Sequence, residues 1–280
     1  KQQQGALCCT ETHNPAFQPL SRTTEHRTHR ASGSKDKDKD RDKAMKIEYI
    51  GHSAFVLADP ASGMRVYIDP AISVVGGKPE EHHPSVILLT HGHGDHVGDT
   101  VELLRANPAA KCFAIVELAG LVGSDLGDES RCVGCNKGGS VDLGSGWSAT
   151  LVDAKHSSSY GSKGAYAGEA AAWVVRAPDG TVVYHTGDTA VFAGMTDIAE
   201  LHKPTVALMC IGGHYTMDPK GAAYAVAKHL ASSLKTVIPM HYGTWPILAG
   251  TPDQFRSELA ALGCKSVEVR VVAPRGETTF

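Results

Sequence analysis

The densest group of chemically active residues is the stretch HGHGDH (residues 91–96), which directly follows the apolar run SVILLT. Imidazole nitrogens and carboxylate oxygens are ligands that transition ions accept at neutral pH. The two intervening glycines have no side chains, so a tight loop can bend there without steric collision. Such a loop can present His91 and His93 to one ion, and Asp95 and His96 to a second ion nearby.

Further ligands follow other apolar runs, which we interpret as strands. They are Asp69 after VYI, His156 after TLVDAK, His185 and Asp188 in YHTGD, and His241 after VIPM. Strand ends are where sites form in α/β sheets, so these residues should converge. His156 can complete the first ligand set, His241 can complete the second, and Asp188 can bridge them. Two ions about 3.5–4 Å apart would ionise a water and stabilise an oxyanion, which is hydrolytic chemistry. His185 should point into the core.

The elements that must position these residues alternate between strands and helices. MKIEYIGHSAFVLAD predicts a strand, a turn and a strand, and PSVILLT predicts a fully buried strand. Helices are expected in DTVELLRANP, DPKGAAYAVAKHL and TPDQFRSELAALG, the last with Thr251 as its N-cap. KSVEVRVVAPRGETTF should close the chain as one strand. This order indicates an α/β fold of two sheets covered by helices.

Residues 1–44 differ in composition from the rest of the chain. They have little apolar periodicity and end in KDKDKDRDKA, so they cannot bury enough apolar surface to offset the entropy cost of ordering. We predict a disordered extension or an artificially added tail, with a minority interpretation as an organelle transit peptide. Residues 45–280 form the predicted hydrolase domain, and Met45 is a plausible native start.

Charge and cysteine content limit the class of protein to which this chain can belong. Residues 1–44 carry 9 of the 27 basic and 6 of the 30 acidic residues, which leaves a net charge near −6 for the remainder. This balance argues against a nucleic-acid partner. No apolar run approaches the roughly 20 residues that span a bilayer. Seven cysteines, an odd number, favour a reduced protein over a disulfide framework, and the pair in CVGC (residues 132–135) is interpreted as loop thiols. We expect a cytoplasmic location.

The motifs resemble a known family. HGHGDH, followed in order by His156, GDT and PMHY, is similar to the signature of the metallo-β-lactamase superfamily. YIGHSAF, HSSS and IGGHYTMDP narrow the resemblance to its UlaG-like branch, named for L-ascorbate-6-phosphate lactonase. The resemblance covers Met45 to Phe280. It implies a four-layer αββα sandwich, two divalent metal ions, and a hydroxide bridging those ions as the nucleophile.

The resemblance also implies roles for single residues. His91, His93 and His156 would hold one ion, Asp95, His96 and His241 the other, and Asp188 both, with Asp95 also taking part in catalysis. Asp69 would orient a ligand from behind, or else only make a local turn. Substrate contacts are expected from His52, which could instead cap a turn, and from Tyr242 and Thr244.

His214, in IGGHYTMDP, is a further candidate for catalysis. Gly212 and Gly213 precede it and give a flexible turn after a buried strand, so its loop should open onto the metal face. There the imidazole could donate to a developing oxyanion or protonate a leaving group. The alternative is a loop that only enters the next helix, capped by Asp218.

The function expected is metal-dependent hydrolysis of a small ester, lactone or phosphoester. The alternatives are a nuclease or phosphodiesterase of the RNA-processing type and a redox protein such as a di-iron reductase. The nuclease predicts a basic insertion between the motifs, which we do not find, and the reductase predicts a fused electron carrier. Zinc is the expected metal, with manganese as the alternative. The expected partner is a small-molecule substrate, with neither nucleic acid nor membrane; assembly into a homo-oligomer stays open.

Overall fold

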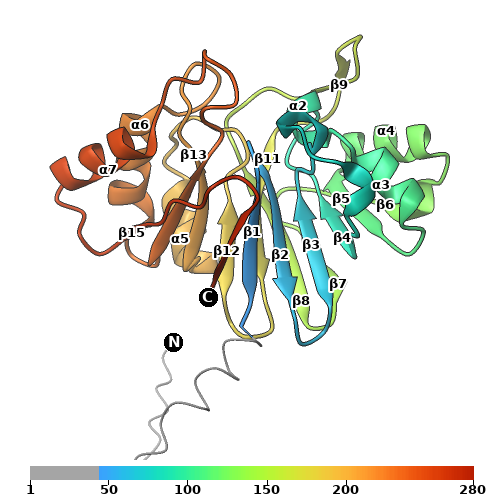
Figure 1. Cartoon of the computed structure of the whole chain (residues 1–280), viewed down its shortest axis with the longest axis horizontal. Helices are drawn as coiled ribbons and strands as arrows, with labels where there is room; N and C mark the ends of the chain where they lie inside the picture. Colours follow the sequence, from blue (N-terminus) through green and yellow to red (C-terminus); the bar gives the residue numbers. More distant parts are fainter. Residues whose placement is uncertain (1–43) are drawn as a thin grey trace, which may run out of the picture.

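Two packed β-sheets lie at the centre of the molecule, with helices on both outer sides (Figure 1). The computed structural model describes residues 44–280. The predicted tail, residues 1–44, therefore lies outside the described residues except for Ala44. The two sheets with their flanking helices confirm the predicted αββα sandwich. Within residues 44–280, none of the helices combines the length and the apolar character needed to cross a membrane.

The first sheet has the order β16-β1-β2-β3-β4-β5-β6. Its strands β1 to β3 are antiparallel, and β3 to β6 are parallel. Their bounds are β1 (Lys46–Gly51), β2 (Ala54–Asp59), β3 (Met64–Ile68), β4 (Val86–Leu88), β5 (Lys111–Ile115), β6 (Cys132–Cys135) and β16 (Gly276–Thr279). The predicted strand–turn–strand at the start is confirmed as β1 and β2, and the predicted strand PSVILLT is confirmed in a shorter form as β4.

The second sheet has the order β15-β14-β13-β12-β11-β8-β7. It is antiparallel from β7 to β12 and parallel from β12 to β15. Its strands are β7 (Ser140–Gly144), β8 (Trp147–Asp153), β11 (Ala171–Arg176), β12 (Val182–His185), β13 (Val206–Cys210), β14 (Thr236–Met240) and β15 (Glu268–Val269). A two-stranded hairpin, β9 (Ser159–Tyr160) with β10 (Ala165–Tyr166), projects from the end of the molecule at which α2 lies (Figure 1).

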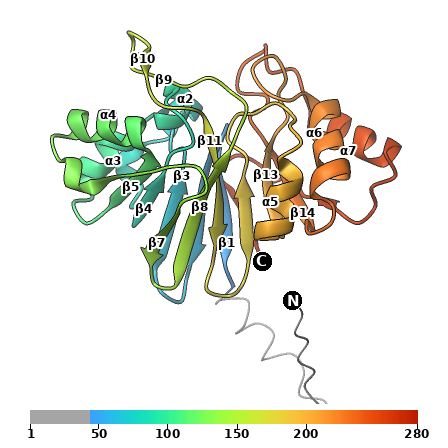
Figure 2. The ribbon, with the colours of Figure 1, turned by 180° about the vertical axis from the view of Figure 1, so that it is seen from behind.

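The helices divide between the two outer sides. α3 (Thr100–Ala106) and α4 (Val116–Leu126) lie on one side, and α5 (Met195–His202), α6 (Pro219–Ala225) and α7 (Pro252–Ala261) lie on the other (Figure 2). α6 continues into a π-helical turn, η4 (Val226–Leu230). The short helix α2 (Gly94–Val97) lies at the end of the sheets where the loops converge. Single 3-10 turns are η1 (Ser73–Val75), η2 (Pro79–Glu81) and η3 (Glu129–Arg131). Thr251 caps α7 through a capping box with Gln254, as predicted.

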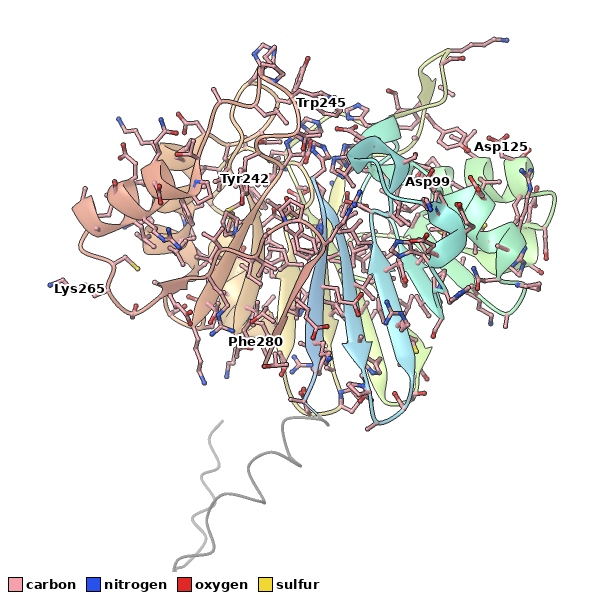
Figure 3. The ribbon with its side chains drawn as sticks, viewed as in Figure 1. Asp99, Asp125, Tyr242, Trp245, Lys265 and Phe280 are labelled. Carbon is pink, nitrogen blue, oxygen red and sulfur yellow. The ribbon has the colours of Figure 1, made fainter. Side chains whose placement is uncertain are left out.

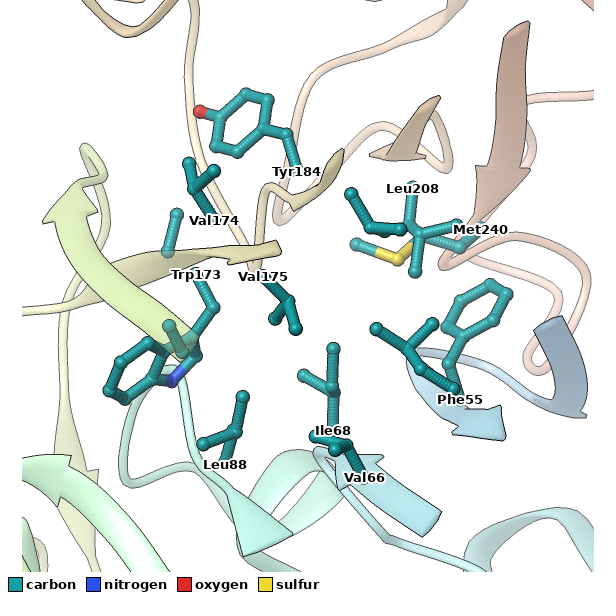
Figure 4. Packing of buried hydrophobic residues seen from close by; sticks show 14 of the residues in the cluster. Phe55, Val66, Ile68, Leu88, Trp173, Val174, Val175, Tyr184, Leu208 and Met240 are labelled. Atoms are coloured by element: carbon teal, nitrogen blue, oxygen red, sulfur yellow. The ribbon is translucent and has the colours of Figure 1, made fainter. Parts of the chain in front are cut away.

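The space between the sheets is filled by apolar side chains from both inner faces. Figure 4 shows Phe55 and Ile68 of the first sheet with Val175 and Met240 of the second, all fully buried. Burying a side chain of this size stabilises the fold by about 1.5–3 kcal/mol. Trp173 on β11 also donates from its indole nitrogen to the carbonyl of Leu89, at 2.9 Å. This hydrogen bond joins the second sheet to Leu89, two residues before the HGHGDH segment begins.

The sequence-based assignment of elements fails in three places. α4 and α5 were not predicted, because neither has a side-chain N-cap and α4 contains two glycines. The predicted C-terminal strand is two strands, β15 in the second sheet and β16 in the first, separated at Pro274 and at Arg275 with φ of 65°. CVGC is strand β6, paired with β5, rather than a loop. The five cysteines within the described range are free, as expected.

Candidate metal centre

All seven predicted ligands converge at one end of the sheets. His91, His93, Asp95 and His96 come from the segment after β4 and from α2, on the first sheet. The others follow strands of the second sheet: His156 follows β8, Asp188 follows β12 and His241 follows β14. The site therefore lies where the two sheets meet, and each sheet supplies part of it.

The candidate ligand atoms form three overlapping groups, and the group of His91, His96 and Asp188 spans two further ones. One of these two consists of His91, His93 and His156, with one ligand atom of each within 4.8 Å of the others. His91 Nε2 lies 3.0 Å from His93 Nδ1, which identifies the nitrogens that face the common point. The other group contains Asp95, His96 and His241 within the same limit, together with His52. These two groups match the two predicted ligand sets, except that His52 was not predicted as a member.

Asp188 lies between the two groups. Its Oδ1 is 3.3 Å from His96 Nε2, and its Oδ2 is 3.0 Å from His241 Nε2 and 3.7 Å from His156 Nε2. The carboxylate thus faces members of both groups. This is the arrangement expected of a bridging ligand.

Unpartnered polar atoms test whether the residues fit metal ions. His96 Nε2, Asp188 Oδ1 and both ring nitrogens of His241 are buried and have no hydrogen-bond partner among residues 44–280. Buried polar atoms rarely remain unpaired in native proteins, because a protein group, a water or an ion usually satisfies them. His96 Nε2 and Asp188 Oδ1 lie at 3.3 Å without hydrogen-bond geometry. The donor set of imidazoles and carboxylates suits zinc or manganese, so the residues fit two divalent ions.

Asp69 contacts one candidate ligand from behind, which is the position that an orienting residue would occupy. The residue is fully buried at the end of β3 (Met64–Ile68). His96 Nδ1 donates to Asp69 Oδ2 at 2.7 Å, which leaves His96 Nε2 as the nitrogen for an ion. The Thr90 hydroxyl and amide also donate to the carboxylate, at 2.6 and 2.8 Å. Thr90 Oγ1 is 3.0 Å from His91 Nδ1, so Thr90 and Asp69 together orient a histidine of each group.

Burial and the neighbouring charges shift the pKa values of several site residues in opposite directions. Burial would lower the pKa of His96, but Asp188 and Asp69 outweigh it and hold that pKa well above its usual value. Burial would likewise raise the pKa of Asp188, yet His96 and His241 hold it well below the usual range. Burial lowers the pKa of His241, but the charge of Asp188 and contacts with Asp188 and Asp95 together raise that pKa to about 8. The pKa of His91 is lowered well below its usual value, mainly by burial, which favours the neutral ring that metals require.

Backbone strain is concentrated here. Asp69, His52, His214 and His241 have φ of 49°, 55°, 58° and 57°. Non-glycine residues rarely adopt this left-handed conformation, and it persists only where the surroundings enforce it. His241 is a candidate ligand, and Asp69 and His52 each contact one, whereas Ser145, Lys203 and Arg275 have the same conformation in turns away from the site.

Of the glycines in HGHGDH, only Gly92 is sterically required. A Cβ on Gly92 would lie 2.7 Å from Ala167 Cβ and 2.8 Å from the Ser159 carbonyl oxygen. A Cβ on Gly94 would meet nothing within 4 Å. The expectation that both glycines avoid collisions therefore holds for Gly92 alone.

The residues predicted to contact substrate are less accessible than that role requires. The side chain of His52 is 0% exposed, because Asp95, His241 and Trp245 surround its ring. A substrate therefore cannot reach this ring, contrary to the expectation from the sequence. Thr244 is half-buried and its hydroxyl is 2.9 Å from His52 Nδ1. Tyr242 is half-buried and packs against the hydrophobic core. His185 is buried in the core, as expected, with Nε2 donating to the Ser53 carbonyl at 2.9 Å.

His214 is exposed on its loop, beside the ring of Tyr215 at 4.4 Å. It lines a cavity of about 390 Å³ with Gly212, Asp218 and Ile247. No hydrogen bond within residues 44–280 joins it to a candidate ligand, so its catalytic role stays a prediction. Asp218 caps α6 by accepting from the Gly221 amide, which is the feature that the alternative interpretation of this loop predicts.

Sequence reasoning missed two residues beside the ligands. Thr90 ends the apolar run directly before His91, and this position in the sequence could have identified it as a residue of the site. Trp245 has its ring 4.9 Å from that of His52 and is 38% exposed. Figure 3 shows Trp245 at the end of the molecule where α2 lies. A separate cavity of about 670 Å³ lies along β1 and Arg275. We give it no part in the chemistry because none of the candidate ligands lines it.

A family model for the beta-lactamase superfamily domain matches residues 46–241, a stretch that contains every candidate ligand. The chain belongs to the metallo-β-lactamase superfamily. It is 41% identical over 223 residues to a UPF0173 metal-dependent hydrolase of Herpetosiphon aurantiacus, covering 77% of this chain and 90% of that protein. A UPF0173 metal-dependent hydrolase of Archaeoglobus fulgidus is 40% identical over 236 residues, covering 82% and 96%.

Solved structures agree with this superfamily assignment. Igni18, described as a novel metallo hydrolase from Ignicoccus hospitalis, aligns with a TM-score of 0.71 and 35% identity, over 85% of this chain and 98% of that one. An isothiocyanate hydrolase from Delia radicum gut bacteria aligns with a TM-score of 0.64 and 18% identity, over 84% and 99%, which shows a shared fold alone. The UlaG-like branch stays a prediction.

Proposed function

We propose that this protein is a hydrolase that uses two divalent metal ions, zinc or manganese, to cleave a small ester, lactone or phosphoester. The observation that carries the proposal is Asp188, whose two buried oxygens face histidines of two separate ligand groups. The similarity to relatives named metal-dependent hydrolases, over about four-fifths of the chain, supports it.

Each group of residues has a defined task in this proposal. His91, His93 and His156 hold one ion, Asp95, His96 and His241 hold the other, and Asp188 holds both. Two bound divalent ions lower the pKa of water to near neutrality and stabilise negative charge on a substrate oxygen. Asp69 and Thr90 keep the histidine rings oriented, and Asp95, on the more exposed side of the site, is also placed to accept a proton.

The surroundings of the site favour a small organic substrate over a nucleic acid. Trp245 and Ile247 are 38% and 46% exposed, and both lie on the loop that follows His241. This loop is fixed, because Gly243 N donates to the Leu248 carbonyl and Gly250 N donates to the Gly212 carbonyl. A nuclease or phosphodiesterase is therefore the second choice.

Metal analysis followed by a substrate screen tests the proposal. We expect about two ions per chain, and turnover of at least one compound in a panel of lactones, aryl esters, thioesters and phosphodiesters. Turnover should stop with a chelator and return with zinc or manganese. Turnover of the phosphodiesters alone would favour the second choice. Purified protein without bound metal, whose activity a chelator does not alter, would contradict the mechanism.

A further inference from the structure

The turn between β1 and β2 reaches into the second ligand group through His52. The ring is fully buried, with Nε2 3.0 Å from Asp95 Oδ2 and Nδ1 2.9 Å from Thr244 Oγ1. These contacts join residues 43 and 192 positions apart in the sequence. A ring held at both nitrogens has one orientation.

The chemistry of the partners fixes the direction of both hydrogen bonds. An ionised carboxylate only accepts, so His52 Nε2 donates to Asp95. In the neutral ring Nδ1 is then the acceptor, and the Thr244 hydroxyl donates to it. Asp95 thereby selects the tautomer of His52, and the Thr244 hydroxyl, which can donate or accept, holds the other side of the ring.

Asp95 is the most exposed of the three acids of the site. It lies on the four-residue helix α2, and its side chain is 25% exposed, against 0% for Asp69 and 3% for Asp188. His52 supplies the one hydrogen bond to its carboxylate among the described residues, because His241 Nε2 and His96 Nε2 are 3.7 and 3.9 Å away. Without His52, no hydrogen bond from residues 44–280 would hold this carboxylate, and only the longer contacts with His241 and His96 would remain.

The backbone of His52 supports the same ligand group. Its carbonyl accepts from the His241 amide at 2.8 Å and from the Tyr49 hydroxyl at 3.0 Å. His241 and His52 both have left-handed backbones, with φ of 57° and 55°. The turn therefore contacts two members of the second group, one through its ring and one through its carbonyl.

We propose that His52 is a positioning residue for the second metal ion, with Thr244 fixing its ring. The proposal rests on the proposed function, since it presupposes two ions. It makes the two ion sites unequal: the site of His91, His93 and His156 is independent of the β1–β2 turn, and the site of Asp95, His96 and His241 is not. The competing assignment makes His52 itself a fourth ligand, because Nε2 belongs to the same 4.8 Å group.

The test compares metal binding by full-length variants, using zinc titrated against a competing chelator and the absorption spectrum of the cobalt-loaded protein. His52→Ala should lower the affinity for one of the two ions about 10–100-fold, as substitutions of other ligand-orienting residues do. The affinity for the other ion should stay unchanged. His52→Gln keeps a donor near the position of Nε2 and should recover part of the loss. Thr244→Val should weaken the same ion less, and Thr244→Ser should behave as wild type.

Thr196→Val is a matched control, because Thr196 Oγ1 makes a similar contact, 2.7 Å long, with His229 Nδ1 on the α5 side of the molecule. It should leave both affinities unchanged. Two equally tight ions in His52→Ala would overturn the proposal. So would complete loss of one ion in both His52→Ala and His52→Gln with a cobalt spectrum showing one nitrogen ligand fewer, since that identifies a ligand. A failure of the proposed function would be distinguishable from a failure of this proposal, because the wild-type protein itself would then bind fewer than two ions.

Discussion

Individual residues show how far a sequence can reveal this site. The ligand types were visible, because histidine and aspartate directly after apolar runs stand out, and all seven converge. Their support was not visible, because contacts such as Thr244 with His52 join positions 192 residues apart. Nor does a sequence show exposure, which is why His52 was expected to meet substrate although its side chain is 0% exposed.

Asp188→Ala should abolish hydrolysis and weaken both ions, because one carboxylate faces both groups. The loss of affinity should exceed the roughly 10–100-fold typical of residues that only orient ligands. The fold should survive, since the residue follows β12 and leaves the core strands unchanged. Metal content, circular dichroism and turnover measured on one preparation provide the check, and full activity would show that the bridge is wrongly assigned.

His214→Ala should retain both ions and lose turnover. The side chain is exposed beside a cavity and contributes to neither ligand group. A positioned acid or oxyanion donor contributes about 10²–10³-fold in rate, so a fall of this size is expected. If turnover stays normal with two ions bound, His214 has no catalytic part; a lower melting temperature would then indicate a packing role in its loop.

At the level of elements, the sequence predicted most strands and the positions of their ends, because buried strands read as apolar runs with polar residues after them. It could not predict sheet membership. β15 and β16 looked like one strand, yet they pair with β14 and β1 in different sheets. Apolar alternation is a local property, whereas pairing depends on which neighbour lies beside the segment. The same limit explains why α4, which has no capping residue, was missed.

Gly98→Ala should destabilise the protein by more than about 1 kcal/mol, because its φ of 40° and close packing do not tolerate a side chain. A Cβ there would lie 2.3 Å from Ala71 Cα, just beyond Asp69. Since Gly98 ends α2, the shift should also weaken the ion held by Asp95 and His96. Thermal unfolding and zinc affinity measure the two effects.

Gly120→Ala is the control for this substitution. Gly120 is exposed within α4 and a Cβ there would meet nothing within 4 Å. Replacing glycine by alanine in a helix stabilises by roughly 0.5–1 kcal/mol. Equal melting temperatures for the two variants would mean that the contact with Ala71 relaxes freely.

For the whole molecule, the two sheets each supply ligands that the other lacks. His91 and His93 belong to the first sheet, and the histidine that completes their group, His156, belongs to the second. The same holds for His241 beside Asp95 and His96. Ions bound at this boundary would therefore connect the two halves of the sandwich as well as activate water.

A protein beginning at Met45 should keep the turnover and metal content of the full chain. The seven candidate ligands, and Asp69 and His52 that contact them, lie within residues 45–280. Steady-state kinetics and metal analysis of both lengths make the comparison. A folded shorter protein with reduced turnover would show that residues 1–44 contribute to activity.

Removing the metal should lower thermal stability, because the ligand groups exist only when both sheets are folded together. Ligand that binds the folded state alone at 100 times its Kd stabilises by about 2.7 kcal/mol. In a domain of this size each kcal/mol shifts Tm by roughly 2–4 °C, so a chelator should lower Tm by about 5–11 °C. Asp188→Ala should show little of this shift, since its affinity for both ions is reduced. An unchanged Tm in the wild-type protein after verified metal removal would mean that the sandwich holds its site without help from the ions.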